Sequence, residues 1–214
     1  MPNESIADSV DQYFRIGLGG RILVGEIVIR RTNKGFVLCH RDDEAREDAE
    51  TFREPENAIE ISRSDDAGDY RPLKTAPNLR HGWQLEVSNA GEVRRALNYF
   101  YPGRLAIFAA WKENRLRTTP LRQTLERQSG MYRVAAKVTD AQIEEVVGNF
   151  CRTEDGCLRR IRWKRDSLGK VPSTKLPPEK FEAHSTHEQI PLLCQEACNL
   201  LVNECRKAAK GENQ

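Results

Sequence analysis

The sequence predicts an α+β fold in which a small antiparallel sheet packed with helices is followed by a mostly helical domain that carries two pairs of cysteines. In the first hundred or so residues, short segments with alternating apolar residues are interspersed with amphipathic helical segments. Beyond residue 115 the apolar residues recur at helical spacing, and five of the six cysteines lie in this part. We therefore expect an α+β domain over residues 12–114 and a helical, cysteine-bearing domain over residues 115–210.

Three segments of the first domain have the composition of strands. RILVGEIVIRR at 21–31 is rich in Ile and Val, and GFVLCHR at 35–41 follows it across a Thr-Asn-Lys-Gly turn. This arrangement predicts a β-hairpin. WQLEV at 83–87 is expected to form a third strand, whereas the charged segment at 42–53 between these strands favours a helix.

Two helices are expected to cover this sheet. Ser88 or Asn89 should cap a helix over residues 90–101, and Pro102 should begin a second helix over residues 103–114. The apolar residues expected to face the core are Val93, Leu97, Phe100, Leu105, Phe108 and Trp111. A helical hairpin over a small sheet is an α+β arrangement rather than a doubly wound one.

The loop before the third strand is unusually long for a compact domain. Residues 65–82 contain Gly68, Pro72 and Pro77, and the loop ends at His81 close to Trp83. Loops of this length often have a functional role. A single histidine beside a strand is more often a structural residue than a metal ligand, and we interpret His81 in that way.

The second domain places its cysteines at two helix ends. A helix capped by Thr139 should run to Phe150 and deliver Cys151, and Cys157 follows the turn-forming Glu-Asp-Gly. Pro191 suits the first position of another helix, which would place Cys194 and Cys198 at i and i+4 on one helical face.

These four cysteines are interpreted as the ligands of one metal centre. Residues at i and i+4 have β-carbons about 5–6 Å apart, which suits thiolates that bind two different irons of a cluster. A single tetrahedral zinc ion needs sulfur atoms roughly 4 Å apart, so the spacing favours a cluster over zinc. The positive end of the helix dipole would also stabilise a net-anionic iron–sulfur core.

Cys205 and Cys39 are expected to be buried cysteines without a ligand role. Cys205 is seven residues beyond Cys198 and therefore about 10 Å further along the helix axis, and Cys39 lies in a predicted strand.

Basic residues surround the first cysteine pair. Positive charge of this kind can offset an anionic cluster and lower the pKa of thiols, although each side chain could equally belong to a solvated face. The residues are Arg152, Arg159, Arg160, Arg162, Lys164 and Arg165.

The segments CRTEDGCLRRIRW and PLLCQEACNLLVNECR resemble the 4Fe-4S-binding domain at the C-terminus of some CbiX-type sirohydrochlorin chelatase-like proteins. The upstream GEIVIRR, GFVLCHRDD, NAGEVRRALNYF and QSGMYRVA resemble the stabilising domain that accompanies it. The resemblance covers residues 12–210 and implies that Cys151, Cys157, Cys194 and Cys198 ligate a 4Fe-4S cluster. In that family a chelatase domain precedes both segments. This sequence shows none, so the resemblance implies no chelatase activity for it.

Composition limits the remaining possibilities. The 34 basic and 32 acidic residues give a net charge of +2, so no global field would attract nucleic acid or an anionic membrane. The N-terminus lacks a leader-like pattern, and LAIFAAW at 105–111 is much too short to span a bilayer. We expect a cytoplasmic protein whose cysteines are not paired in disulfides, since the cytoplasm is reducing.

The leading hypothesis is a 4Fe-4S protein that transfers electrons or serves as a redox accessory to a partner protein. By the resemblance, the partner could be a separate chelatase in sirohaem or cobalamin metabolism. No catalytic motif or set of acid, base and nucleophile is evident. An enzyme would therefore have to use the 65–82 loop as a pocket, with a structural cluster.

The alternative is a four-cysteine structural zinc protein with a nucleic-acid-binding patch, in which the basic residues at 159–165 grip phosphates and Trp163 stacks on a base. A zinc site built from His184, His187, Cys194 and Cys198 is also conceivable, but it would leave the first cysteine pair without a role.

Overall fold

The computed structural model describes residue 11, residue 14 and residues 20–153, 156–170 and 189–212. The chain forms two compact units, and one segment of the C-terminal half belongs to the first of them. Unit 1 comprises Met1–Arg115 and Phe181–Leu192, and unit 2 comprises Leu116–Lys180 and Leu193–Gln214.

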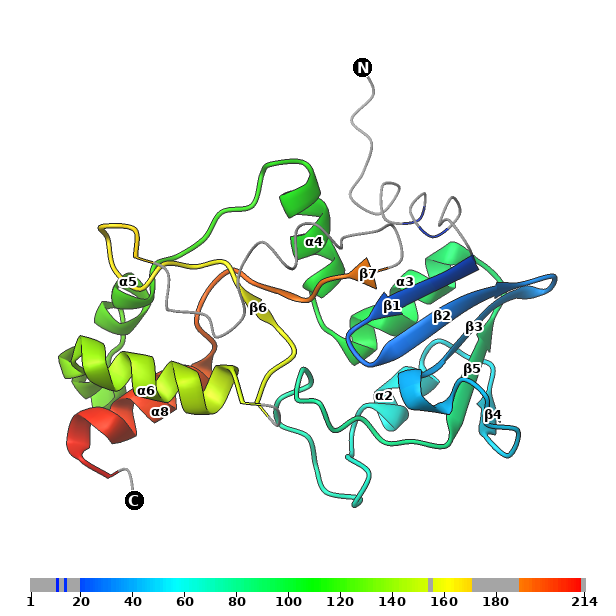
Figure 1. Cartoon of the computed structure of the whole chain (residues 1–214), viewed down its shortest axis with the longest axis horizontal. Helices are drawn as coiled ribbons and strands as arrows, with labels where there is room; N and C mark the ends of the chain where they lie inside the picture. The colour runs from blue at the N-terminus through cyan, green and yellow to red at the C-terminus, as the bar shows by residue number, and fades with distance from the viewer. Residues whose placement is uncertain (1–10, 12–13, 15–19, 154–155, 171–188, 213–214) are drawn as a thin grey trace. The chain divides into compact units, whose positions relative to one another are not determined.

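A six-stranded sheet forms the centre of unit 1, with the strand order β4-β5-β3-β2-β1-β7 (Figure 1). Its strands are β1 (Arg21–Val24), β2 (Ile27–Thr32), β3 (Gly35–His40), β4 (Glu50–Phe52), β5 (Trp83–Val87) and β7 (Gln189–Ile190). The predicted hairpin is present as β2 and β3, which pair antiparallel from Ile27–His40 to Thr32–Gly35. The α+β fold is therefore confirmed.

The sheet is mixed rather than purely antiparallel. The four central strands are antiparallel, but β4 pairs parallel to β5 and β7 pairs parallel to β1. The expected helix at 42–53 is instead a short 3-10 helix, η2 (Arg41–Asp43), a turn and the edge strand β4. Residues 21–31 also form two strands rather than one, because Gly25 adopts a φ of +60° and turns the chain.

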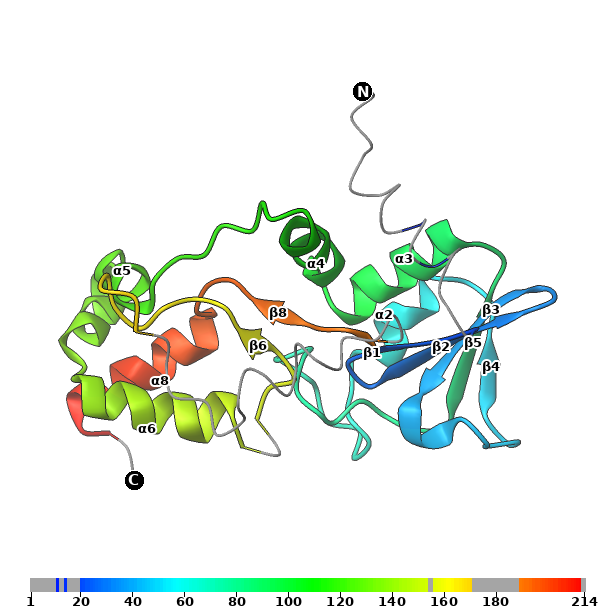
Figure 2. The same cartoon turned by 45° about the horizontal axis from the view of Figure 1, so that its top comes forward.

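Unit 1 also contains the helices α2 (Asn57–Ile61), α3 (Ala90–Phe100) and α4 (Arg104–Lys112). Helices α2 and α3 pack against each other and against strands β5 and β3, as Figure 2 shows. The Asn89 side chain caps α3 by accepting a hydrogen bond from the backbone of Glu92. Of the six predicted core residues on α3 and α4, all but Trp111 are buried.

Unit 2 is mostly helical. The elements described in it are α5 (Leu121–Glu126), the 3-10 helix η3 (Gly130–Lys137), α6 (Asp140–Cys151), β6 (Arg160–Ile161), β8 (Leu193–Cys194) and α8 (Asn199–Lys210). Helix α8 packs against both η3 and α6, and the core between them is formed by residues such as Ile143, Val147 and Leu201. The two short strands β6 and β8 pair in parallel beside this core.

The prediction that a helix begins at Pro191 is wrong, because the helix begins eight residues later in the chain. Residues Leu193 and Cys194 form the strand β8, and the helix begins only at Asn199 with Cys198 as its N-cap. Pairing with β6 explains the extended conformation, because the backbone carbonyl of Cys194 accepts a hydrogen bond from Arg162 N at 2.9 Å. Cys194 and Cys198 are therefore not i and i+4 on one helical face.

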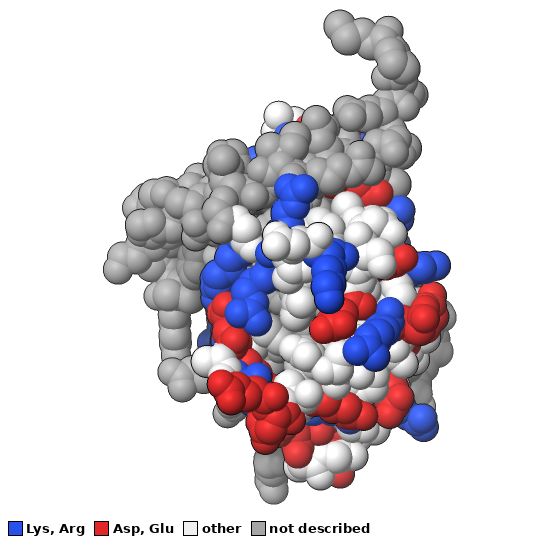
Figure 3. Space-filling model, turned by 90° about the vertical axis from the view of Figure 1, so that its right-hand side faces the viewer, with Lys and Arg blue, Asp and Glu red and all other residues white. Residues whose placement is uncertain are grey.

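The surface carries both signs of charge. On the face shown in Figure 3, lysine and arginine side chains alternate with aspartate and glutamate, and acidic side chains gather along the lower part. This mixture agrees with the net charge of +2. None of the helices in the described part of the chain is long and apolar enough to cross a membrane.

Gly35→Ala tests the packing of the central sheet. Gly35 has a φ of +139°, and a Cβ atom there would lie 2.3 Å from the backbone oxygen of Val87. We expect a loss of at least about 2 kcal/mol in the free energy of unfolding, measured by urea denaturation, because strain and a backbone clash combine. Gly68→Ala is the control, since Gly68 also has a positive φ, +89°, but has open space around its Cβ position. It should cost about 1 kcal/mol. Equal losses in both variants would contradict the packing argument.

Candidate metal centre

Helix α6 carries Cys151 at its C-terminal end. Its N-terminus is fixed by a capping box, in which the Thr139 side chain accepts from Gln142 N and the Gln142 side chain accepts from Thr139 N. Ile143, Val146 and Val147 then anchor one face of the helix in the core of unit 2. Cys151 is the last residue of the helix, as the sequence predicted, and its side chain packs against that core.

Cys157 follows a tight turn. Gly156 N donates a hydrogen bond to the carbonyl oxygen of Thr153 at 3.0 Å. A Cβ atom at position 156 would lie 2.8 Å from Thr153 Oγ1 and 3.0 Å from the carbonyl oxygen of Phe150, so the turn requires glycine there. This turn folds the chain back after α6 and places Cys157 near Cys151.

Cys194 and Cys198 approach from the other part of unit 2. Cys194 is buried at the end of β8, and Cys198 is the N-cap of α8. The Cys194 sulfur accepts a hydrogen bond from Trp163 Nε1 at 3.2 Å, and its thiol donates to the carbonyl oxygen of Glu196 at 3.1 Å. The position of Cys194 is thus set by strand pairing, and the position of Cys198 is set by the start of a helix.

The four cysteines converge in one place. Burial raises the pKa of the Cys151 thiol, and the nearby Cys157, Cys198 and Cys194 raise it further by charge repulsion. The Cys194 thiol is likewise affected by the charges of Cys157 and Cys198, so the four thiols lie near one another.

Comparison with protein families agrees with this geometry. Residues 113–207 match the family described as a 4Fe-4S iron-sulfur cluster binding domain, and residues 10–115 match the DR2241 stabilising domain. The chain therefore joins a DR2241 stabilising domain to a 4Fe-4S cluster-binding domain. Its cofactor is a 4Fe-4S cluster. Unit 2 holds most of the cluster-binding domain, and unit 1 holds the stabilising domain.

The chain is also similar to part of a solved structure. The crystal structure of DR2241 from Deinococcus radiodurans is described as a multi-domain protein with structural similarity to chelatases and with two additional novel domains. It is 26% identical to this chain and superposes with a TM-score of 0.77 over 97% of the chain. The match covers 42% of DR2241, so this chain spans less than half the length of that protein. No curated protein matches the chain.

Positive charge in the cluster-binding domain suits an anionic cofactor. Arg159 Nε donates a hydrogen bond to Cys157 Sγ at 3.3 Å. Burial lowers the pKa of Arg159, but the neighbouring Cys157, Cys194 and Cys198 outweigh it and raise the pKa overall. Arg152, next to Cys151, has its Nε and Nη2 atoms buried without a hydrogen-bond partner. A buried guanidinium of this kind is stabilised by a nearby negative charge, which a thiolate-bound cluster supplies.

The other two cysteines, Cys39 and Cys205, are both buried. Cys205 is fully buried on α8 in the core of the cluster-binding domain, and burial raises the pKa of its thiol to about 12. Cys39 is buried in β3 of the stabilising domain. The predicted burial of both residues is confirmed. His184 and His187 lie outside the described residues.

Trp163 has a different role from the one considered in the nucleic-acid alternative. Its side chain is fully buried and donates to Cys194 Sγ, so it is not available to stack on a base. The sequence analysis missed this hydrogen bond, and it also missed the one from Arg159 to Cys157. Trp163 and Arg159 each lie within six residues of Cys157, and indole and guanidinium N–H groups are donors that can reach a cysteine sulfur.

The sequence analysis also missed a cluster of polar residues in the stabilising domain. His40, Asp43 and His81 each offer a ligand atom, and these atoms lie within 4.8 Å of one another. The H-x-x-D spacing of His40 and Asp43 directly after a strand was the available signal. His81, interpreted above as a structural residue, completes this group from the long loop.

Proposed function

We propose that Cys151, Cys157, Cys194 and Cys198 are the four ligands of the 4Fe-4S cluster, and that the protein transfers single electrons as a redox accessory to another protein. The observation that carries this proposal is the convergence of these four side chains from α6, the following turn, β8 and the start of α8. Of the two other cysteines, Cys39 is buried in unit 1, and Cys205 is buried in the core that Cys151, Cys194 and Cys198 also contact.

The proposed ligand set favours electron transfer over substrate activation. Four cysteine ligands occupy one position on each iron, which leaves no iron open to bind a substrate. The hydrogen bonds from Trp163 and Arg159 reach two of the four sulfurs. Such hydrogen bonds tune the reduction potential of a cluster, because they stabilise its more negative, reduced state.

The proposed partner is a chelatase-like protein. DR2241 is described as structurally similar to chelatases, and this chain corresponds to 42% of it. We propose that the chain acts beside such an enzyme in tetrapyrrole metabolism, of the sirohaem or cobalamin branch. This step is an argument from analogy with a structural neighbour. A cytoplasmic location is also part of the proposal, because a reducing compartment keeps the six cysteines available as thiols.

Serine substitutions test the ligand assignment. Cys151→Ser, Cys157→Ser, Cys194→Ser and Cys198→Ser should each abolish stable cluster binding, because each removes one of only four thiolate ligands. Iron and sulfide per chain are measured after anaerobic reconstitution. Cys39→Ser and Cys205→Ser are matched controls and should retain the wild-type content. Full iron retention in Cys157→Ser would break the assignment.

Trp163→Phe tests the electron-transfer role. Loss of the hydrogen bond to Cys194 should make the reduction potential more negative by about 20–60 mV, if that bond contributes about 0.5–1.5 kcal/mol. Trp111→Phe, in the stabilising domain, is the matched control and should leave the potential unchanged.

The potentials are measured by anaerobic redox titration of cluster-loaded protein. We expect a reversible one-electron transition in the wild type and in both variants. Irreversible loss of the cluster on reduction of the wild type would contradict an electron-transfer role. Equal potentials in Trp163→Phe and the wild type would contradict the role given to the hydrogen bond.

A further inference from the structure

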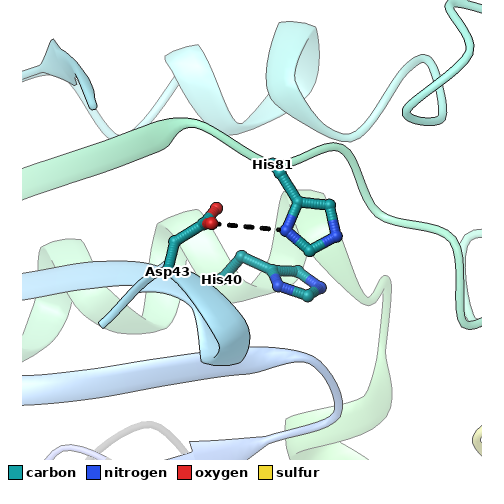
Figure 4. Close-up of side chains that lie close together, drawn as sticks. All are labelled: His40, Asp43 and His81. Carbon is teal, nitrogen blue, oxygen red and sulfur yellow. Dashed lines mark hydrogen bonds and ion pairs between the residues drawn. The ribbon is translucent and has the colours of Figure 1, made fainter. Parts of the chain in front are cut away.

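A compact group of histidine and carboxylate side chains lies in the stabilising domain, within unit 1. His40 is the last residue of β3, Asp43 ends η2 immediately after it, and His81 lies just before β5 (Figure 4). Strands β3 and β5 are paired neighbours in the sheet. The sheet therefore brings together two loops that are about forty residues apart in the sequence.

The distances within this group suit metal coordination. The three candidate ligand atoms lie within 4.8 Å of one another, and His81 Nδ1 is 3.4 Å from Asp43 Oδ1. Two ligand atoms bound to a tetrahedral zinc ion at ~2.0–2.1 Å are themselves about 3.4 Å apart. The two imidazole rings are also close, with centroids 3.9 Å apart. Only small side-chain movements would bring all three donors onto one ion.

His40 is buried and incompletely partnered. Its side chain is 2% exposed, and its Nε2 atom is buried without a hydrogen-bond partner. A buried polar nitrogen without a partner costs free energy. Carboxylates flank both ring nitrogens, because Glu26 Oε1 lies 3.6 Å from Nε2 and Asp42 Oδ2 lies 3.7 Å from Nδ1. Whichever nitrogen bound a metal, the other would face a carboxylate, as metal-bound histidines usually do.

Several contacts fix the position of Glu26, the carboxylate that faces His40 Nε2. It is 2% exposed and accepts a hydrogen bond from Leu79 N at 3.2 Å through Oε2. The buried Arg71 guanidinium lies 3.7 Å from the same oxygen. The backbone N–H of Glu26 also donates to the Tyr101 hydroxyl at 3.0 Å. Arg71 is therefore a counter-ion for the Glu26 carboxylate.

Hydrogen bonds with the backbone of the long loop position Asp43 and His81. Asp43 Oδ2 accepts a hydrogen bond from Gly82 N at 2.7 Å, which leaves Oδ1 facing His81. The Arg46 guanidinium lies 3.7 Å from Asp43 Oδ1, but its closer partner is Asp48 at 2.7 Å. His81 N donates to Asp66 Oδ1 at 2.9 Å, and this bond fixes the loop that carries the histidine.

We infer that His40, Asp43 and His81 bind a divalent transition-metal ion of the zinc or iron(II) class. Two imidazoles and one carboxylate suit these ions rather than calcium or magnesium, which prefer oxygen ligands. Three protein ligands leave at least one coordination position for water or a small ligand. The His81 side chain is 34% exposed, so the site is accessible to solvent. This site is separate from the four cysteines and independent of the function proposed for them.

Hydrogen bonding alone is the competing explanation for the group, since Asp42 N donates to His40 Nδ1 at 3.2 Å. The test is a calorimetric titration of cluster-loaded full-length protein with Zn²⁺ under anaerobic conditions. The wild type should bind one zinc ion more per chain than His81→Gln or Asp43→Asn. If a variant still binds this zinc ion, its affinity for zinc should be at least 10–100-fold weaker than that of the wild type, which is the loss typical of removing even an outer-shell partner. His184→Gln/His187→Gln is the matched control and should bind as the wild type does.

Zinc X-ray absorption on the same samples identifies the ligands. Nitrogen and oxygen neighbours at ~2.0–2.1 Å in the wild type, lost in His81→Gln, would support the site. Sulfur neighbours at ~2.3 Å alone, or equal zinc stoichiometry and affinity in the wild type and both variants, would overturn it. His81→Gln is preferred to a His40 substitution because His81 is partly exposed and its replacement is compatible with folding.

Discussion

The burial of cysteine side chains at one place in unit 2 is the constraint on which the rest of that unit depends. Burial, followed by repulsion from the neighbouring cysteines, raises the pKa of the thiols of Cys151 and Cys194, so four thiolates gathered there are unfavourable unless cations hold them. The iron ions of a 4Fe-4S cofactor are such cations, although the cluster with its thiolates is net anionic, and its binding free energy then contributes to folding. The helices of the described part of unit 2 are at most 12 residues long and its strands have two residues each, and small units of this kind are commonly stabilised by a bound metal.

The secondary structure around the cysteines follows from the same constraint. A capping box and an apolar face fix α6 so that its last residue is Cys151, and pairing of β8 with β6 holds Cys194 beneath Trp163. The guanidiniums of Arg152 and Arg159 are partly buried beside the sulfurs, where they would be costly without nearby negative charge. Arg152, Arg159, the buried indole of Trp163 and the thiols are therefore parts of one electrostatic arrangement.

Local signals in the sequence predicted local structure well. The hairpin of β2 and β3, the Asn89 and Thr139 caps and the apolar face of α3 each depend on neighbouring residues, and each was predictable for that reason. Features that depend on distant pairing were not predictable. Ile190 joins the sheet beside Val24, and Cys194 is extended because it pairs with β6 although Pro191 and the leucines around it favour a helix. His81 was judged singly, and only the pairing of β3 with β5 brings it to His40 and Asp43.

The central claim is that four cysteines of one unit hold a 4Fe-4S cluster. Iron, acid-labile sulfide and zinc should be counted, together with an absorbance spectrum, on one sample of the wild-type chain purified without oxygen. The claim predicts a brown protein with about four irons and four sulfides per chain and a broad absorbance shoulder near ~400 nm, which bleaches in air. A colourless, air-stable protein with one zinc ion bound through sulfur would contradict it.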